Sequence, residues 1–350
     1  MKKKNIIKKL LSVVLSAATV FSLLTLPAHA IVPGEDSYTG QEDGYIRIDV
    51  ETQTREFIPK SDVPNFTGES TYDVLNPIDK ARMEAINQEI IAEYEQGVEL
   101  LDVTDGDYTY VSPVTDRYSG IVILGIFSDS TYDNCIGWGT GFMLNEDTLL
   151  TALHNFYDFM KNDITQFNML SYNPYVRVYY DIERDFFSDS TDDPRIAARN
   201  HLRDSNKYVT IDSVIFSSAI DGTDCDDREY DWAIGKLATP LSNVEYFWDC
   251  TVFKNTMQGK TSKAVGYPGS HALKMIETSG TIFDADPNTK LIYLTNSSDS
   301  GMSGGPLYIT TLTGIKCCGI LAQYSDTFQT MLGVEIFDDL LDVIVSCMEE

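Results

Sequence analysis

A serine lies among glycines in the run Gly301-Met302-Ser303-Gly304-Gly305-Pro306. Glycine has no Cβ, so the backbone around Ser303 can turn sharply and come close to a substrate. The amides of Gly301 and Ser303 can then converge beside the Ser303 hydroxyl, where they would stabilise the oxyanion of a tetrahedral intermediate. A Gly/Ser-rich turn without chemistry has the same composition. Because a serine nucleophile needs a base, the motif predicts acyl-transfer chemistry only if the chain supplies one.

The base is predicted to be a histidine at a strand end. The chain has four histidines: His29, His154, His201 and His271. Two apolar stretches, 139–144 and 148–153, flank a short polar turn and predict a hairpin, and His154 directly follows the second stretch. The segment around His201 is polar and predicted to be exposed, and His271 follows the turn at 266–269. His154 is therefore the candidate general base.

A catalytic imidazole needs a carboxylate that fixes its tautomer and stabilises the imidazolium. Asp231 opens the alternating apolar run 231–237, which predicts a half-buried strand with the carboxylate at its mouth. The acids at 224, 226 and 227 lie in a polar loop and are expected to be solvated. Taken alone, Asp231 also fits an ordinary turn residue at a strand end.

The order His154, Asp231, Ser303 resembles that of the chymotrypsin-like serine peptidases, and more closely their secreted bacterial glutamyl endopeptidase (V8-like) branch. The similar segments are Leu150–His154, Asp231–Ile234, Val265–Gly269 with Met275–Glu277 and Gly280–Ile282, and Gly301–Pro306. They lie between Tyr118 and Tyr324, and their order is more specific than any one of them.

The resemblance implies an all-β fold of two Greek-key six-stranded β-barrels with the active site between them. His154 and Asp231 would come from the first barrel, about 118–240, and Ser303 from the second, about 241–335. In such enzymes the serine attacks a peptide carbonyl, the histidine transfers the proton and the two amides form the oxyanion hole. We therefore expect protein or peptide substrates, no metal or other cofactor, and a monomer.

Two departures accompany the resemblance. His154 and Asp231 are 77 positions apart, a longer separation than this branch suggests, and we expect the extra length as a surface insertion in the acidic stretch 181–227. Asn155 stands where the animal enzymes carry a cysteine, so the disulfide beside the base is absent.

The substrate pocket matches the family only in part. Ser298 fits the small hydroxyl residue of the glutamyl endopeptidases, but Leu321 occupies the position of their acid-binding histidine. Leu321 and Ala322 indicate a less polar pocket, so the sequence does not predict glutamate specificity. Ser297 stands where a trypsin-like enzyme would carry Asp, so a preference for Arg or Lys is also unsupported.

The N-terminal region predicts export. Residues 1–30 combine five lysines, an apolar stretch at 10–26 and the cleavage signature Ala28-His29-Ala30, which together are typical of a secretory signal peptide. Their removal leaves 21 basic and 53 acidic residues. Such a charge disfavours nucleic acid and anionic membranes as partners. We expect a secreted protein.

Residues 31–112 carry none of the peptidase motifs and are predicted to be a partly helical propeptide, with a plain N-terminal spacer as the alternative. Asn76 can cap a helix that has Pro77 in its first turn and apolar residues at 83, 86, 90 and 94. The maturation cut is expected between residues 99 and 114. The peptidase domain is then 113–350, and it closes with an amphipathic helix at about 336–349, expected to pack on the second barrel.

The six cysteines, Cys135, Cys225, Cys250, Cys317, Cys318 and Cys347, permit up to three disulfides in an exported chain. Their spacing does not fit zinc. The acidic loop 221–227 could bind calcium but does not match an EF-hand, and a solvated loop is the alternative.

Two other functions remain open from the sequence: a catalytically inactive double-barrel binding protein, and an esterase that uses the same three residues. An α/β-hydrolase is disfavoured because the serine motif lacks the strand–elbow–helix setting of that fold.

Overall fold

The structure is a computed structural model, and it describes a defined part of the chain. The described residues are 43–66, 68–95, 108–113, 116–163, 166–182, 193–219, 227–253, 257–271, 273–286, 288–325 and 330–350. The predicted signal peptide and almost all of the 221–227 loop lie outside them.

The first barrel is built from six antiparallel strands. They are β4 (Ile121–Phe127), β5 (Cys135–Met143), β6 (Thr148–Thr151), β9 (Val176–Tyr179), β10 (Tyr208–Ser217) and β11 (Ala233–Leu237). Around the barrel the order is β4, β5, β6, β11, β10, β9, and β9 closes the ring by pairing with β4. The run 231–237, predicted as a half-buried strand, contains the barrel strand β11.

The second barrel has the same winding. Its strands are β12 (Thr261–Gly266), β13 (Ile276–Asp286), β14 (Leu291–Leu294), β15 (Pro306–Thr311), β16 (Gly314–Ser325) and β17 (Thr330–Glu335). They follow one another as β12, β13, β14, β17, β16, β15 around the closed ring. In both barrels the third strand therefore neighbours the sixth. The prediction of two six-stranded Greek-key barrels with a C-terminal helix is confirmed.

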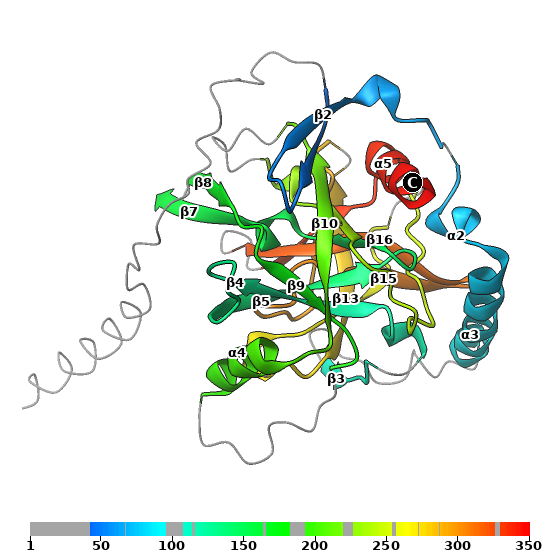
Figure 1. Ribbon diagram of the computed structural model, residues 1–350. Helices are drawn as coiled ribbons and strands as arrows, with labels where there is room; N and C mark the ends of the chain where they lie inside the picture. Colours follow the sequence, from blue (N-terminus) through cyan, green and yellow to red (C-terminus); the bar gives the residue numbers. More distant parts are fainter. Residues whose placement is uncertain are drawn as a thin grey trace, which may run out of the picture. The chain divides into compact units, whose positions relative to one another are not determined.

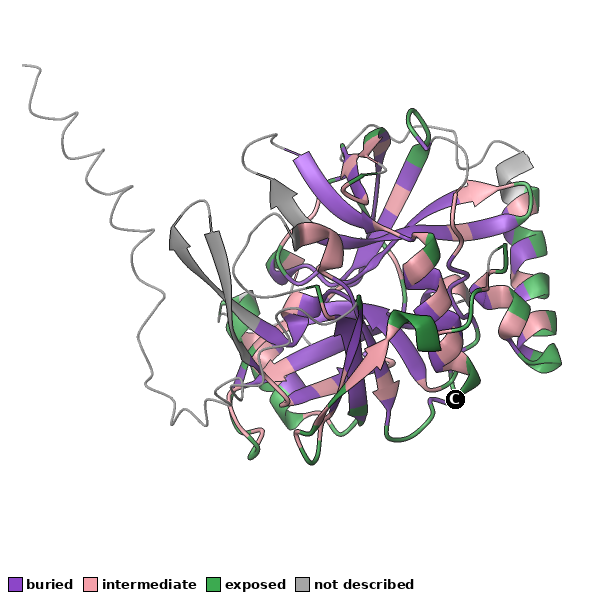
Figure 2. Cartoon of the chain, turned by 90° about the horizontal axis from the view of Figure 1, so that it is seen from above, coloured by how far each residue is buried: buried purple, intermediate pink, exposed green. Residues whose placement is uncertain are grey.

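Buried residues, coloured purple in Figure 2, make up most of the strands. The core of the second barrel is a separate cluster that includes Met257, Ile282, Leu321 and Met331. The larger cluster fills the first barrel and continues beneath the helices outside it. Both cores pack the large apolar side chains that alternate along the strands, and this burial stabilises the fold.

The segment before the barrels is part of the same packed body. The hairpin of β1 (Gly44–Asp49) and β2 (Arg55–Pro59) extends the first sheet, because β1 pairs with β10. The strand β3 (Tyr108–Tyr110) pairs with β13 in the second sheet. Helix α3 (Pro77–Glu95) begins as predicted, with Asn76 Oδ1 accepting from the Asp79 amide at 3.1 Å. Removal of 31–112 stays a prediction, and it would require these contacts to break.

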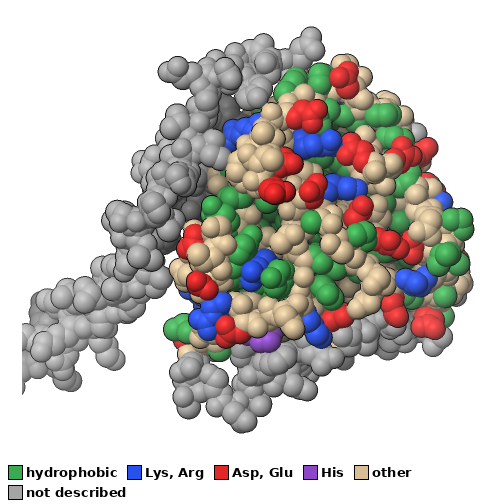
Figure 3. All heavy atoms as spheres, in the orientation of Figure 1, with side chains coloured by type: hydrophobic (Ala, Val, Ile, Leu, Met, Phe, Trp, Pro, Cys, Tyr) green, Lys and Arg blue, Asp and Glu red, His purple; other side chains and the backbone are tan. Residues whose placement is uncertain are grey.

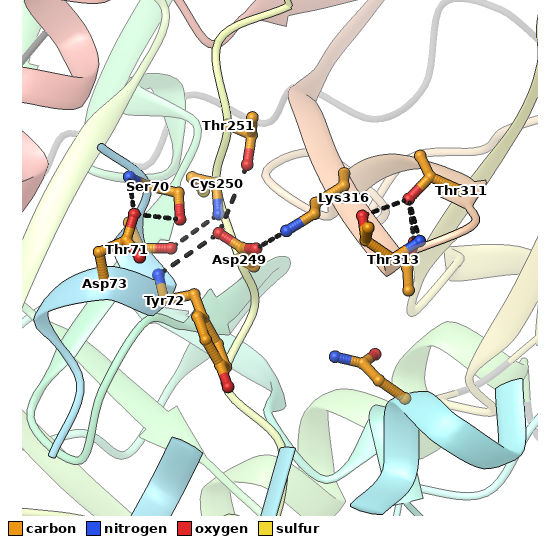
Figure 4. A network of polar contacts seen from close by, with 12 residues as sticks. Ser70, Thr71, Tyr72, Asp73, Asp249, Cys250, Thr251, Thr311, Thr313 and Lys316 are labelled. Atoms are coloured by element: carbon orange, nitrogen blue, oxygen red, sulfur yellow. Dashed lines mark hydrogen bonds and ion pairs between the residues drawn. The ribbon is translucent and has the colours of Figure 1, made fainter. Parts of the chain in front are cut away.

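The short helix α2 (Thr71–Val74) ties this segment to the linker between the barrels (Figure 4). The hydroxyl of Thr71 donates to the Trp248 carbonyl at 3.1 Å and accepts from the Cys250 amide at 2.7 Å. Asp249, only 3% exposed, accepts from the Tyr72 amide and forms an ion pair with Lys316. The buried carboxylate is thus paired, as burial of a charge requires.

Helix α5 (Asp338–Glu349) forms where the amphipathic pattern predicted it. Its expected position on the second barrel is wrong: Lys236 Nζ on β11 donates to the Cys347 carbonyl at 2.9 Å, and the helix packs on β11 and α2. Figure 1 shows it beside the β1–β2 hairpin, where Lys60 forms an ion pair with Asp339. The helix therefore packs against the outside of the first barrel.

The remaining short elements lie before or between the barrel strands. They are η1 (Lys60–Asp62), η3 (Asp116–Tyr118), η4 (Leu153–Asn155), β7 (Tyr157–Asp163), β8 (Gln166–Tyr172), α4 (Pro194–Asp204), η6 (Asp227–Tyr230) and η7 (Gly269–His271). The expected insertion at 181–227 is only partly a surface insertion, because β10 inside it is a barrel strand. Its helix α4 packs on β5 and η7.

The disulfide prediction is not supported. The five cysteines in the described residues are buried and free: Cys135, Cys250, Cys317, Cys318 and Cys347. The adjacent Cys317 and Cys318 belong to different cores, as expected for neighbours on a strand. An even cysteine count permits disulfides but does not require them.

Acidic and basic side chains are interspersed over the described part of the face shown in Figure 3. Among the described residues, no cluster of three or more His, Cys, Asp or Glu could hold a metal ion. Within the same part of the chain, no helix has the length and hydrophobicity to cross a bilayer.

Candidate active site

The winding of the first barrel brings His154 and Asp231 together. Strands β6 and β11 are antiparallel neighbours, with Thr151 opposite Ala233. The end of β6 and the start of β11 therefore lie at the same edge of the barrel. His154 follows β6 in the turn η4, and Asp231 directly follows the turn η6, two residues before β11 begins. Residues 77 positions apart thus meet because their strands pair.

The Asp231 carboxylate holds His154 with both oxygens. Oδ2 lies 2.8 Å from the ring Nδ1, and Oδ1 accepts from the backbone amide of His154 at 3.0 Å. These contacts fix the orientation of the ring, with Nδ1 facing Asp231. The imidazole is 28% exposed and the carboxylate 14%. Burial lowers the pKa of His154, but the negative charge and hydrogen bond of Asp231 outweigh it, so that the pKa is raised overall.

The Ser303 loop, residues 299–305, belongs to the second barrel and sits directly on the first. The Ser303 carbonyl accepts from the Thr140 amide at 2.8 Å and from Asn155 Nδ2 at 3.1 Å. Gly304 has a φ of +88°, and a Cβ there would lie 2.1 Å from the Thr140 carbonyl oxygen. Only glycine fits this close approach, which explains why the sequence places one after Ser303.

Two amides of this loop are unoccupied. Within the described residues, the N–H groups of Gly301 and Ser303 donate to no partner. The Gly301 carbonyl, by contrast, accepts a hydrogen bond from Thr140 Oγ1 at 2.7 Å. Gly301 has a φ of +98°. Trp138 Nε1 donates to the neighbouring Tyr267 carbonyl at 2.8 Å. The arrangement leaves both amides able to bind an anionic oxygen.

The residues predicted to line the substrate pocket differ in their positions. Ala322 contributes its carbonyl, which accepts from Ser303 Oγ at 3.4 Å. The hydroxyl of Ser298 contacts Met331 Sδ at 2.9 Å. The side chain of Leu321 is 1% exposed and belongs to the second-barrel core. Leu321 therefore packs among apolar side chains, and Ser298 contacts one of them. That these residues line a substrate pocket stays a prediction.

The other described histidines lie apart from the Asp231 contacts. His271 packs its ring against Tyr108 and Tyr110, at centroid distances of 5.0 and 5.7 Å. His201 lies on α4, where it is half-buried rather than exposed as predicted, and burial lowers its pKa.

Sequence reasoning missed three residues that shape the site: Trp138, Thr140 and Met331. The signal for Thr140 was available, because glycines on both sides of it indicate a backbone that approaches another segment closely. Met331 carries no such signal, since an apolar residue in a strand is ordinarily core.

Comparison with known proteins supports the fold. A solved structure of a Glu endopeptidase in complex with MPD superimposes with a TM-score of 0.52 and 20% sequence identity. The match covers 71% of this chain and 99% of that one. No protein-family model and no curated protein sequence matches the chain. The similarity therefore establishes a chymotrypsin-like fold and leaves the activity to be argued from the site.

Proposed function

We propose that this protein is a serine endopeptidase that hydrolyses peptide bonds through Ser303, His154 and Asp231. The observation that carries the proposal is the pair His154–Asp231, joined at 2.8 Å at the edge of the first barrel, next to a serine loop with two unoccupied amides. A structural serine would need neither an oriented imidazole nor free amides beside it.

In the proposed mechanism, Ser303 Oγ attacks the substrate carbonyl while His154 Nε2 takes its proton. Asp231 keeps Nδ1 protonated and stabilises the imidazolium that forms. The Gly301 and Ser303 amides stabilise the oxyanion. His154 then protonates the leaving amine, and water releases the acyl group from Ser303 by the same steps. No metal or other cofactor takes part.

The proposal includes export and activation. Residues 1–30 would direct secretion, and a cut between residues 99 and 114 would convert a zymogen to the mature form. The substrates are proteins or peptides, and we expect a monomer. The apolar surroundings of Leu321 and the contact between Ser298 and Met331 favour an uncharged residue before the scissile bond. From the resemblance to glutamyl endopeptidases we carry over the three catalytic residues, and we do not carry over the preference for glutamate.

Labelling with a fluorophosphonate tests the proposal, because such reagents react with an activated serine. Purified protein, before and after limited proteolysis, should be labelled at Ser303 and should cleave peptides of a mixed library. Ser303→Ala should lose both the label and the cleavage. Sites cut in the library, identified by mass spectrometry, give the residue preference.

Absence of labelling and of cleavage in every processed form would contradict the proposal and favour the binding protein. Labelling with hydrolysis of esters but not of peptides would favour the esterase. The retained pair of His154 and Asp231 favours the peptidase over the binding protein, which would not need it.

A further inference from the structure

Asn155, the residue after the predicted base, makes contacts that the triad does not explain. Its side chain is 3% exposed and belongs to η4, the same turn as His154. Asn155 Nδ2 donates to Thr151 Oγ1 at 2.9 Å and to the Ser303 carbonyl at 3.1 Å. The amide thus links two loops that come from different barrels.

The surrounding backbone is shaped to hold this amide. A Cβ on Gly139 would lie 2.1 Å from Asn155 Oδ1, so only glycine leaves room for the carboxamide. Thr151 Oγ1, which accepts from Asn155, donates in turn to the Thr140 carbonyl at 2.6 Å. The Thr140 amide shares the Ser303 carbonyl with Asn155. These bonds form a closed ring in which each donor is buried and paired.

Adjacent residues of one turn therefore point to different halves of the site. The imidazole of His154 is directed to Asp231, while the amide of Asn155 is directed to the Ser303 carbonyl. The predicted base is thus connected to the predicted nucleophile through the peptide bond to Asn155 and the hydrogen bond from Asn155 to the Ser303 carbonyl. Thr140 and Asn155 both hold the Ser303 carbonyl from the first barrel, and Asn155 is the one adjacent to His154.

We propose that Asn155 is a positioning residue, which holds the Ser303 loop in register with His154. The inference rests on the proposed function. Proton transfer between a hydroxyl and an imidazole requires close approach, so a small shift of the loop slows acylation without weakening substrate binding.

The test compares two side-chain amides within 113–350. Asn155→Ala should lower kcat and the rate of fluorophosphonate labelling about 10²-fold, with KM changed less than about twofold. The control is Asn173→Ala between β8 and β9, where Nδ2 donates to the Phe127 carbonyl at 2.9 Å and Oδ1 accepts from the Tyr175 amide at 2.9 Å. The control should lower the melting temperature while kcat and the labelling rate stay within about twofold of the wild type. Thermal unfolding of both variants is measured in parallel.

Thr151→Val supplies a second variant of nearly unchanged volume. It removes the hydroxyl that orients Asn155 Nδ2 and should lower kcat in the same direction by a smaller factor. If Asn155→Ala does not fold, this variant decides the question.

Labelling of Asn155→Ala or Thr151→Val at the wild-type rate would overturn this inference and leave the proposed function standing. Equal losses of kcat in the Asn173 and Asn155 variants would also overturn it, because the effect would then be one of stability. A wild-type protein that is never labelled would overturn both proposals.

Discussion

The two barrels share one winding but use the same corner differently. In the first, the residues after the third strand and before the sixth are His154 and Asp231, joined by a hydrogen bond at 2.8 Å. In the second, the corresponding corner holds Ser298, after β14, and Met331, at the start of β17, in contact at 2.9 Å. One corner carries ionisable groups, and the other carries a hydroxyl against a thioether.

The difference shows how one topology yields two kinds of surface. The first barrel supplies reactive side chains that are fixed by side-chain hydrogen bonds. The second supplies a backbone loop, whose amides and serine are fixed by contacts with the first barrel at Thr140 and Asn155. The chemistry therefore depends on side chains in one barrel and on backbone geometry in the other. Substitutions in the two barrels should therefore impair activity in different ways.

Removing the charge in the first-barrel corner should have the largest effect. Asp231→Asn should lower kcat about 10⁴-fold, because the amide favours the wrong imidazole tautomer. Asp231 raises the pKa of His154, and the base works only when neutral, so any residual activity should extend to lower pH. Steady-state kinetics across pH measures both effects.

Asp147→Asn is the matched control for that substitution. Asp147 lies in the turn at the other end of the same hairpin, 2.9 Å from Lys236 Nζ. Its loss should leave kcat and the pH profile nearly unchanged. Equal effects of the two substitutions would remove the special role of the Asp231 corner.

In the second barrel, the backbone should be the sensitive element. A Cβ on Gly301 would lie 2.5 Å from the Tyr267 carbonyl oxygen and 2.7 Å from Trp138 Nε1, at a φ of +98°. Gly301→Ala should therefore displace the oxyanion amide and lower kcat about 10²–10³-fold. Gly137→Ala on β5 is the control, because a Cβ there meets no atom within 4 Å. Unchanged kinetics in Gly301→Ala would argue against an oxyanion hole at this loop.

The smallest effect is expected in the second-barrel corner. Met331→Ala should enlarge the space beside Ser298 and shift the preference for the residue before the scissile bond toward larger apolar side chains, by about tenfold in kcat/KM. Peptides that differ only at that residue measure the shift. A uniform loss of kcat/KM for all of them would mean that Met331 supports the barrel and does not contact substrate.

The sequence predicts the barrels and the site to different depths. Strand positions follow from alternation and turns, and Asp231 was identifiable as the acid at the mouth of a strand. The contact between Asn155 and Ser303 could not be identified from the sequence. It joins residues 148 positions apart and depends on how the two barrels pack against each other. The amphipathic pattern of α5 predicted an apolar face but could not specify which barrel that face would cover.

The pairing of the earliest described strand with elements from far along the chain has a kinetic consequence. Tyr45 on β1 lies opposite Ser217, and its hydroxyl donates to the Asp339 carbonyl, 294 positions away. The Phe66 amide donates to Asp342 across 276 positions. The hairpin cannot reach its final environment until α5 has been synthesised. The contacts between this segment and α5 can therefore form only late, and folding should be slow and largely post-translational.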